Sequence, residues 1–264
     1  MVKGVLHIHS THSDGEFSIA ELRDLYVDAG CRFACITDHA DSFDEERLAA
    51  YLRDCEHQSD ERFRFIPGLE YTCADRMHIL GYGARRLIDS IDPETVIERI
   101  VDLGGVAVIA HPKDSAFAGI EQFEVLPDGI EVWNSKYDGR YAPRPATFAL
   151  LGRLRARRPA MRAFYGQDLH WRRQYRGLLT MVSGDRSDRE AVLSDLRRGD
   201  YVGVKDGLRL PSDGVLDPAL VARFGRQHER SRSLRLLIKG AKASADRVGV
   251  TVPGSVKAQL RRIF

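Results

Sequence analysis

Short apolar runs alternate with amphipathic stretches along the first two thirds of the chain. Seven runs have the length of buried strands, at residues 5–9, 33–37, 63–71, 77–82, 106–110, 129–133 and 161–165. Helical patterns lie between them, at 18–28, at 43–55, after Asp92-Pro93 and at 146–157. Near-continuous apolar strands are typical of a sheet covered on both faces. The alternation predicts an α/β fold with a mainly parallel sheet, and seven strands favour a closed or nearly closed barrel.

The strand rhythm ends near Leu210, and a basic stretch follows. Residues 215–264 contain eleven Lys or Arg and three Asp or Glu, a balance of +8, which leaves −6 for residues 1–214 in a chain of net charge +2. We therefore predict a barrel over 1–214 and a basic, mostly helical C-terminal extension over 215–264, packed on the barrel or tethered to it. The asymmetry is compatible with contact to a polyanion or an acidic membrane, and equally with a solvated helix face packed on the acidic body.

Composition excludes several classes of protein. Apolar residues make up 43% of the chain, which is enough for a sizeable core, so a wholly disordered chain is excluded. No apolar run approaches the ~20 residues that span a bilayer, and the N-terminus carries no signal-peptide pattern, so we expect a cytoplasmic protein. The four cysteines form no CxxC pair and are predicted to be reduced, mostly buried thiols.

Metal-ligating residue types recur where successive predicted strands end. They are His7, His9, Asp14, His39, Glu70, His78, His111, Asp168 and His170. Alternate residues of a strand share a face, so we expect His7 and His9 to reach one metal ion. Active sites of α/β barrels form at the rim where the strands end. Nine ligands exceed the needs of one ion, and imidazole with carboxylate suits zinc, iron or manganese better than calcium.

Six short motifs carry a resemblance to a known family. They are His7-Ile8-His9-Ser10, Ser13-Asp14-Gly15, Thr37-Asp38-His39, Gly68-Leu69-Glu70, Ala110-His111-Pro112 and Asp168-Leu169-His170. In this order, over residues 5 to about 185, they resemble the PHP family, the polymerase and histidinol phosphatase superfamily of metal-dependent phosphoesterases. The resemblance implies a distorted seven-stranded (β/α) barrel that holds two or three divalent ions of zinc, manganese or iron. Several relatives have histidine where Asp14 stands, which favours the branch of small phosphodiesterases and nucleotide-releasing phosphoesterases.

The resemblance also implies a ligand set for each ion. The three sets are His7, His9, Glu70 and Asp168; Glu70, His78 and His111; and Asp14, His39 and His170. Glu70 would bridge two ions, and a hydroxide held between ions would attack phosphorus in line. Glu70, His39 and His170 are therefore the candidate catalytic residues, with the two histidines as candidates for protonating the leaving group. Asp38 is expected to form a supporting hydrogen bond rather than to bind metal.

We accordingly expect a hydrolase that acts on a phosphate mono- or diester of a small metabolite or nucleotide. Phosphate also needs cationic donors, and the candidates near the strand ends are Lys113, Lys136, Arg140 and Arg173. The alternatives are an exonuclease or oligonucleotide phosphatase, a histidinol-phosphatase-like enzyme, and a non-catalytic, metal-stabilised binding module. The full set of nine ligand types argues against the last, because a degenerate module is expected to lose ligands.

Overall fold

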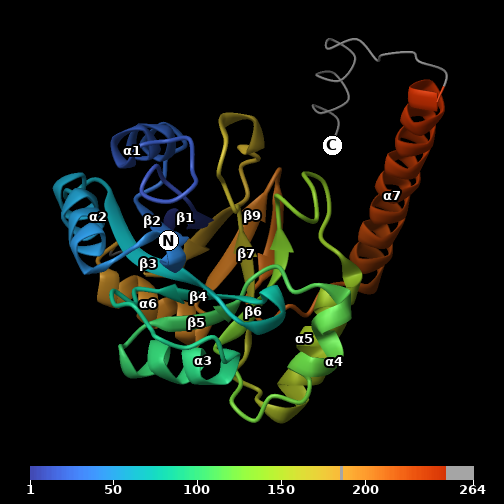
Figure 1. Cartoon of the computed structure of the whole chain (residues 1–264). Helices are drawn as coiled ribbons and strands as arrows, with labels where there is room; N and C mark the ends of the chain where they lie inside the picture. The colour runs from blue at the N-terminus through green and yellow to red at the C-terminus, as the bar shows by residue number, and fades with distance from the viewer. Residues whose placement is uncertain (185–186, 248–264) are drawn as a thin grey trace.

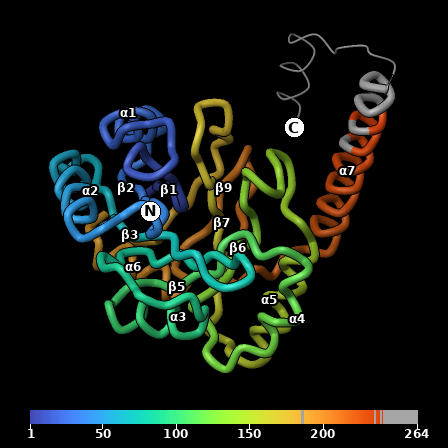
Figure 2. The backbone as a smooth tube through the Cα atoms, in the orientation of Figure 1, coloured from blue at the N-terminus to red at the C-terminus, as the bar shows by residue number. Residues whose placement is uncertain are grey.

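One mixed sheet forms the centre of the protein in the computed structural model, which describes residues 1–184 and 187–247 (Figures 1 and 2). Its strands within these residues are β1 (Val2–Ile8), β2 (Phe33–His39), β3 (Arg64–Thr72), β4 (His78–Tyr82), β5 (Val106–Ile109), β6 (Gly129–Asn134), β7 (Arg162–Gly166), β8 (Leu179–Val182), β9 (Tyr201–Lys205) and β10 (Leu208–Pro211). Their order in the sheet is β10-β9-β8-β1-β2-β3-β4-β5-β6-β7. The predicted α/β class is therefore confirmed.

The sheet curls so that the segment after β7 reaches β1. Strands β1, β2 and β3 are parallel, β4 runs antiparallel to both β3 and β5, and β5, β6 and β7 are again parallel. Beyond β7, the Gln167 amide donates to the Leu6 carbonyl at 3.0 Å, and the His9 amide donates to the Leu169 carbonyl at 3.0 Å. The segment after β7 thus joins β1, and β1 to β7 form a nearly closed barrel.

The predicted count of seven strands is wrong for this sheet, which has ten among the described residues. The seven apolar runs became β1 to β7, but β8, β9 and β10 extend the sheet as an antiparallel meander beside the first half of β1. These strands are four or five residues long, and β9 alternates buried with half-buried positions. They lack the continuous apolar runs that identify a buried parallel strand.

Helices surround the sheet (Figure 1). They are α1 (Ile19–Asp28), α2 (Glu45–His57), α3 (Pro93–Asp102), α4 (Phe117–Ile120), α5 (Pro145–Arg157), α6 (Arg189–Arg198) and α7 (Pro218–Arg247), with short 3-10 turns η1 (Ala40–Ser42), η2 (Ala74–Arg76), η3 (Asp114–Ala116) and η4 (Arg172–Gln174). Ser18 caps α1 in a capping box with Glu21, and Asp92 caps α3 with Pro93 in its first turn. These caps satisfy the free amides of the first helical turn and define where both helices begin.

The basic extension begins with a single long helix, α7, which leaves the body beside α5 (Figures 1 and 2). Its root is anchored by Phe224, which is buried and whose ring centroid lies 6.1 Å from that of buried Trp133. Farther along, Leu234, Leu236 and Leu237 are exposed. The remainder of the predicted extension, residues 248–264, lies outside the described residues.

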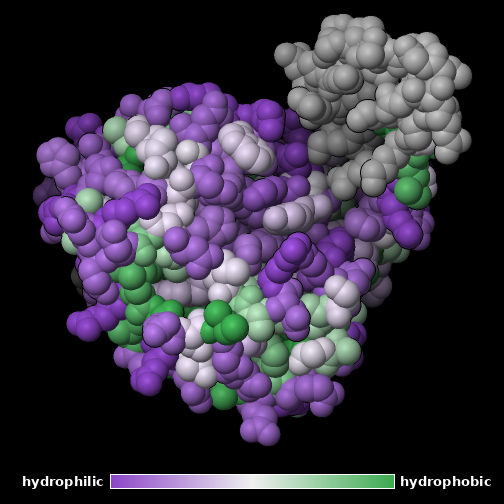
Figure 3. Space-filling model, in the orientation of Figure 1, coloured by the Kyte–Doolittle hydropathy of each residue, from purple (hydrophilic) through white to green (hydrophobic). Residues whose placement is uncertain are grey.

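Burial agrees with the expected core. All four cysteines carry free, buried thiols, as predicted, and burial raises the pKa of Cys31 and of Cys73 to about 12. Within the described ranges, no helix combines the length and apolar character needed to cross a bilayer. The face seen in Figure 3 is largely hydrophilic, with hydrophobic residues gathered low on it in the area of α3 and α4.

Candidate metal centre

The barrel brings all nine candidate ligands to one rim. They come from the end of β1 (His7 and His9), the following loop (Asp14), β2 (His39), β3 (Glu70), the start of β4 (His78), the residue pair after β5 (His111) and the segment after β7 (Asp168 and His170). Because β4 runs antiparallel to its neighbours, its first residue lies at the rim where the parallel strands finish. A residue at the start of β4 therefore joins residues at the ends of the other strands.

The donor atoms form four overlapping groups, each with its atoms within 4.8 Å of one another. The groups are His7, His9 and Asp168; His7, Glu70 and His111; His39, Glu70 and His78; and His9, Asp14, His39 and His170. Every predicted ligand belongs to at least one group. The overlap arises because several side chains face two groups at once, which is the arrangement that a polynuclear metal centre requires.

Glu70 lies at the middle of these groups. Its Oε2 is 3.1 Å from His9 Nε2 and 3.2 Å from His7 Nε2, while its Oε1 is 2.6 Å from His78 Nδ1 and 3.2 Å from His111 Nε2. Burial opposes ionisation of this carboxyl, but His7 and hydrogen bonds from the neighbouring imidazoles hold the pKa of Glu70 well below its ordinary value. Its two ionised oxygens thus face different histidine pairs, as a bridging carboxylate must.

Asp14 closes the solvent side of the cluster. Its Oδ2 lies 3.2 Å from His170 Nε2, and its Oδ1 lies 3.7 Å from His39 Nε2. The Asp14 side chain is about half exposed, whereas that of His170 is buried. Burial opposes protonation of His170, yet the carboxylates of Asp14 and Asp168 raise the pKa of His170 to about 9. This outer group is therefore the part of the centre most accessible from solvent.

His9 provides the test of whether these residues fit a metal ion. It is fully buried, and neither ring nitrogen has a hydrogen-bond partner among the described residues, although Nε2 is close to Glu70. Burial lowers the pKa of His9 to about 3, so the imidazole is neutral and offers a lone pair. Buried polar atoms are normally satisfied, and a neutral imidazole among carboxylates is a preferred ligand of transition metals. The donor set therefore fits divalent metal ions.

Unusual backbone geometry directs several of these side chains. His7, His111 and Asp168 have φ values of 57°, 28° and 52°, in the left-handed region that L residues rarely adopt. The pairing of β1 with β2 shifts register between Leu6 and Ile8, so His7 lies in a bulge. The expected strand alternation therefore does not explain how His7 and His9 converge. Their rings still lie 5.2 Å apart, because the bulge redirects His7.

Sequence reasoning missed Glu131, a buried carboxylate of β6 that supports the ligands. Its Oε1 accepts a hydrogen bond from His7 Nδ1 at 2.8 Å, and its Oε2 accepts from the His111 amide at 2.9 Å and from Asn134 Nδ2 at 2.9 Å. Asn134 Nδ2 also donates to Asp168 Oδ2 at 3.1 Å. Gly166 makes room for this carboxylate, because an added Cβ there would meet Glu131 Oε1 at 1.6 Å. The available signal was a lone charge within an apolar strand.

Asp38 holds the loop that carries Asp14. Its carboxylate accepts hydrogen bonds from the amide and the hydroxyl of Ser10, both at 2.8 Å, and from the hydroxyl of Ser13. The supporting hydrogen bonds expected of Asp38 are thus present. They fix the turn that follows His9, since both serines lie within it.

The four candidate phosphate-binding cations occupy different positions. Lys136 is inside the cluster, with Nζ 3.0 Å from Asp168 Oδ1 and 3.3 Å from both ring nitrogens of His170. Lys113 lines a cavity next to His78 and His111. Arg140 and Arg173 are exposed and lie over the rings of Tyr141 and Trp171. Over residues 1–184 and 187–247, no hydrogen bond or ion pair in the structure joins either guanidinium to the nine ligand candidates.

Fold and site together define an α/β barrel with a cluster of candidate metal ligands at one rim. Comparison with solved structures shows which known proteins share this fold. The chain is similar to a two-domain protein from Bacteroides vulgatus that contains a predicted PHP-like metal-dependent phosphoesterase, with a TM-score of 0.59 and 16% identity over 79% of this chain and 66% of that one. It is also similar to PsfC from Pseudomonas syringae, with a TM-score of 0.52 and 15% identity over 88% of this chain and 98% of that one. The chain thus has a PHP-like fold.

Sequence comparison gives one shorter likeness. The chain is 36% identical over 77 residues to the DNA polymerase/3′-5′ exonuclease PolX of Bacillus subtilis, which is 26% of this chain and 14% of that protein. The chain therefore matches about a seventh of the length of this relative. No family model matches the chain.

Proposed function

We propose that the protein is a metal-dependent phosphoesterase that hydrolyses a phosphate mono- or diester of a small metabolite or nucleotide. One observation carries the proposal: nine side chains from seven parts of the barrel converge in overlapping groups around the ionised, buried carboxylate of Glu70. The PHP-like fold supports it, since the similar Bacteroides protein is described as containing a predicted metal-dependent phosphoesterase.

In this proposal two or three ions of zinc, manganese or iron are held by the predicted sets. These sets are His7, His9, Glu70 and Asp168; Glu70, His78 and His111; and Asp14, His39 and His170. When bound, such ions lower the pKa of a coordinated water and neutralise charge on phosphoryl oxygens. Asp168 suits its part in the first set, because its pKa is held well below the ordinary value by His7 and other neighbouring cations, against the effect of burial.

The remaining roles belong to side chains of the chain itself. The ammonium group of Lys136, between Asp168 and His170, is placed to hold a phosphoryl oxygen through a charge-assisted hydrogen bond. His39 and His170 both face Asp14 at the solvent side of the cluster. His39 or His170 would protonate the leaving oxygen only through a ring nitrogen that does not bind the third ion, and Glu70 would help to hold the first and second ions.

Hydrolysis by metal-reconstituted protein tests this proposal. The substrates are an aryl phosphate monoester and a bis-aryl phosphate diester, assayed with manganese, zinc or ferrous iron and after chelation. We expect turnover that depends on metal and falls at least 100-fold in the double variant His7→Ala/His9→Ala. The variant His57→Ala, which removes an exposed imidazole near the end of α2, should retain wild-type activity. Absence of turnover in folded, metal-loaded protein on either ester would contradict broad phosphoesterase action.

Nucleic-acid hydrolysis is a second candidate, favoured by two observations. The extension over 215–264 is strongly basic, and the matched region of PolX belongs to a protein whose name includes a 3′-5′ exonuclease. In this case exposed arginines of α7 such as Arg226 and Arg230 would hold the phosphate backbone. A polyanion is then the partner of this helix.

Charge reversal distinguishes the two candidates. For an exonuclease or oligonucleotide phosphatase, Arg226→Glu/Arg230→Glu should lower the cleavage of a single-stranded oligonucleotide at least tenfold and leave aryl phosphate hydrolysis unchanged. For a small-molecule esterase, the substitutions should change neither oligonucleotide cleavage nor aryl phosphate hydrolysis. A histidinol-phosphatase-like enzyme would instead prefer histidinol phosphate as its monoester substrate. A metal-stabilised binding module would bind metal without turnover.

A further inference from the structure

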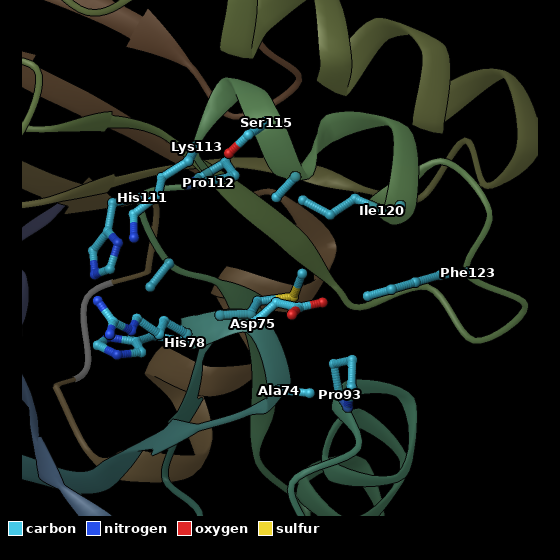
Figure 4. Close-up of a pocket in the computed structure, with 15 residues that line it drawn as sticks. Ala74, Asp75, His78, Pro93, His111, Pro112, Lys113, Ser115, Ile120 and Phe123 are labelled. Carbon is cyan, nitrogen blue, oxygen red and sulfur yellow. The ribbon is translucent and has the colours of Figure 1, made fainter.

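A cavity of about 440 Å³ adjoins the metal centre (Figure 4). Two of its lining residues, His78 and His111, also belong to the groups of ligand atoms around Glu70. His78 Nδ1 and His111 Nε2 lie 2.6 Å and 3.2 Å from the same oxygen of Glu70, Oε1. A ligand bound at these imidazoles therefore has direct access to the cavity.

The cavity has a charged end and an apolar end. Figure 4 shows Lys113, His111 and His78 at one end, Asp75 between the ends, and Ile120 and Phe123 toward the other end. Most lining residues are apolar, and the remaining apolar members are Ala74, Met77, Pro93, Ala110, Pro112 and Ala116. Small-molecule sites are commonly lined in this way, with few polar groups that fix orientation and an apolar wall that receives the body of the ligand.

A sharp turn shapes one wall of the cavity, and hydrogen bonds from Arg144 hold the other. On one side η2 turns sharply, with Asp75 and Arg76 at φ values of 56° and 57°. On the other side Arg144 donates to the Pro112 carbonyl and to Asp114 Oδ1, both at 2.6 Å, and so holds the segment that carries Lys113. Because its donors are used in these contacts, Arg144 positions the wall, and the cavity is formed before any ligand enters.

We propose that this cavity binds the ester group of the substrate, and that this group is compact and largely apolar, such as a single aromatic ring. The inference rests on the proposed phosphoesterase function. The phosphoryl group lies at the His78 and His111 end, and the ester group extends toward Ile120 and Phe123. The volume is within the range of about 300–1,000 Å³ typical of small-molecule sites. It selects a monomeric phosphate ester rather than an internal link of a polymer.

Gly119 is a lining residue at which an added Cβ would clash with no neighbouring atom. This residue of α4 lines the cavity, and a Cβ built on it meets no other atom within 4 Å. Gly119→Leu therefore adds apolar bulk at the cavity, and Ala116→Leu does so from a neighbouring position. Gly152 of α5 is the matched control, since it is also helical and exposed, its Cβ also meets nothing, and it does not line the cavity.

The test measures equilibrium binding of two phosphonates, whose P–C bond is not hydrolysed, to manganese-loaded protein by calorimetry. Phenylphosphonate should bind wild-type protein at least tenfold more tightly than methylphosphonate, because the ring buries apolar surface in the cavity. Gly119→Leu and Ala116→Leu should each abolish this preference and leave the affinity for methylphosphonate within twofold, which also verifies folding. Gly152→Leu should keep the preference.

Two outcomes separate this inference from the function on which it rests. Equal affinity of wild-type protein for both phosphonates, or a phenyl preference that survives both cavity substitutions, overturns the ester-group site and leaves phosphoryl binding intact. Failure of metal-loaded wild-type protein to bind either phosphonate contradicts the phosphoesterase proposal itself, and the inference with it.

Discussion

Glu131 connects the strained residues of the centre. His7 and His111 both have left-handed backbone conformations, and both donate a hydrogen bond to this carboxylate, His7 from Nδ1 and His111 from its amide. Such conformations cost about 1–3 kcal/mol each and persist where the surroundings determine them strongly. The hydrogen bond at His7 Nδ1 also leaves Nε2 as the nitrogen that faces the cluster. Glu131 therefore orients His7 and His111, although it belongs to none of the ligand groups itself.

Glu131→Gln tests this orienting role. A glutamine of the same shape has one oxygen, so its amide group must face either the His7 ring, with one hydrogen bond lost, or the His111 amide and Asn134, with two lost. We expect metal affinity to fall about 10- to 100-fold, as is typical for partners of metal-bound histidine. Competition with a fluorescent chelator measures the affinity, and saturating metal should restore most of the hydrolysis.

The exposed residue Glu124 supplies the control for that substitution. Glu124→Gln should leave metal affinity unchanged. Wild-type affinity in Glu131→Gln would show that the carboxylate plays no part in orienting the imidazoles.

The sequence was sufficient to place the nine ligand candidates together but not to find their support. The candidates follow separate predicted strands, so parallel topology alone brings most of them to one rim. Glu131 lies inside an apolar strand and belongs to no motif, and its role depends on Gly166 of the neighbouring strand. The bulge at His7 was equally hidden, because it arises from pairing between β1 and β2.

Elements with local signals were predicted well. Ser18 and Asp92 cap α1 and α3 where the helical patterns at 18–28 and after Asp92-Pro93 begin, because capping depends on residues within one turn. Strands β8 to β10 and helix α6 were missed, since they add to the barrel through antiparallel pairing rather than through the βα rhythm. The long helix α7 covers Pro218–Arg247, with buried Phe224 near its start, and the division of the chain at residue 214 stays a prediction.

Phe224→Ala should weaken that attachment. The substitution removes a buried ring next to Trp133 and α5, and a loss of this kind costs about 3 kcal/mol in free energy of unfolding. We expect faster proteolysis within α7 and altered fluorescence of Trp133. Leu237→Ala, on an exposed position of the same helix, should change neither. Unaltered proteolysis and fluorescence in Phe224→Ala would mean that α7 is held by other contacts.

At the scale of the whole molecule, the centre ties distant parts of the chain together. Its ligands span residues 7 to 170 and come from opposite ends of the barrel sequence, so ions bound there would connect β1, β2, β3, β4 and the segments after β5 and β7. A ligand that binds only the native state stabilises it by mass action. Metal binding is therefore expected to act on global stability as well as on the site.

Thermal unfolding measures this coupling. At a metal concentration of 100 Kd, each ion adds about 2.7 kcal/mol to native stability, which corresponds to a rise in Tm of about 5–10 °C for a chain of this size. Chelation should reverse the rise, and His7→Ala/His9→Ala should show a smaller rise, because it lacks two ligands of the first set. A Tm that is the same with and without metal in wild-type protein would contradict binding by the native barrel.

Metal stoichiometry tests the central claim most directly. Wild-type protein is stripped with chelator, reconstituted with manganese, freed of excess ion and measured by elemental analysis beside His7→Ala/His9→Ala and His57→Ala. The account predicts two or three ions per chain in the wild type and in His57→Ala, and at least one fewer in the double variant. Folded wild-type protein that retains less than one ion per chain with manganese, zinc and iron alike would contradict it.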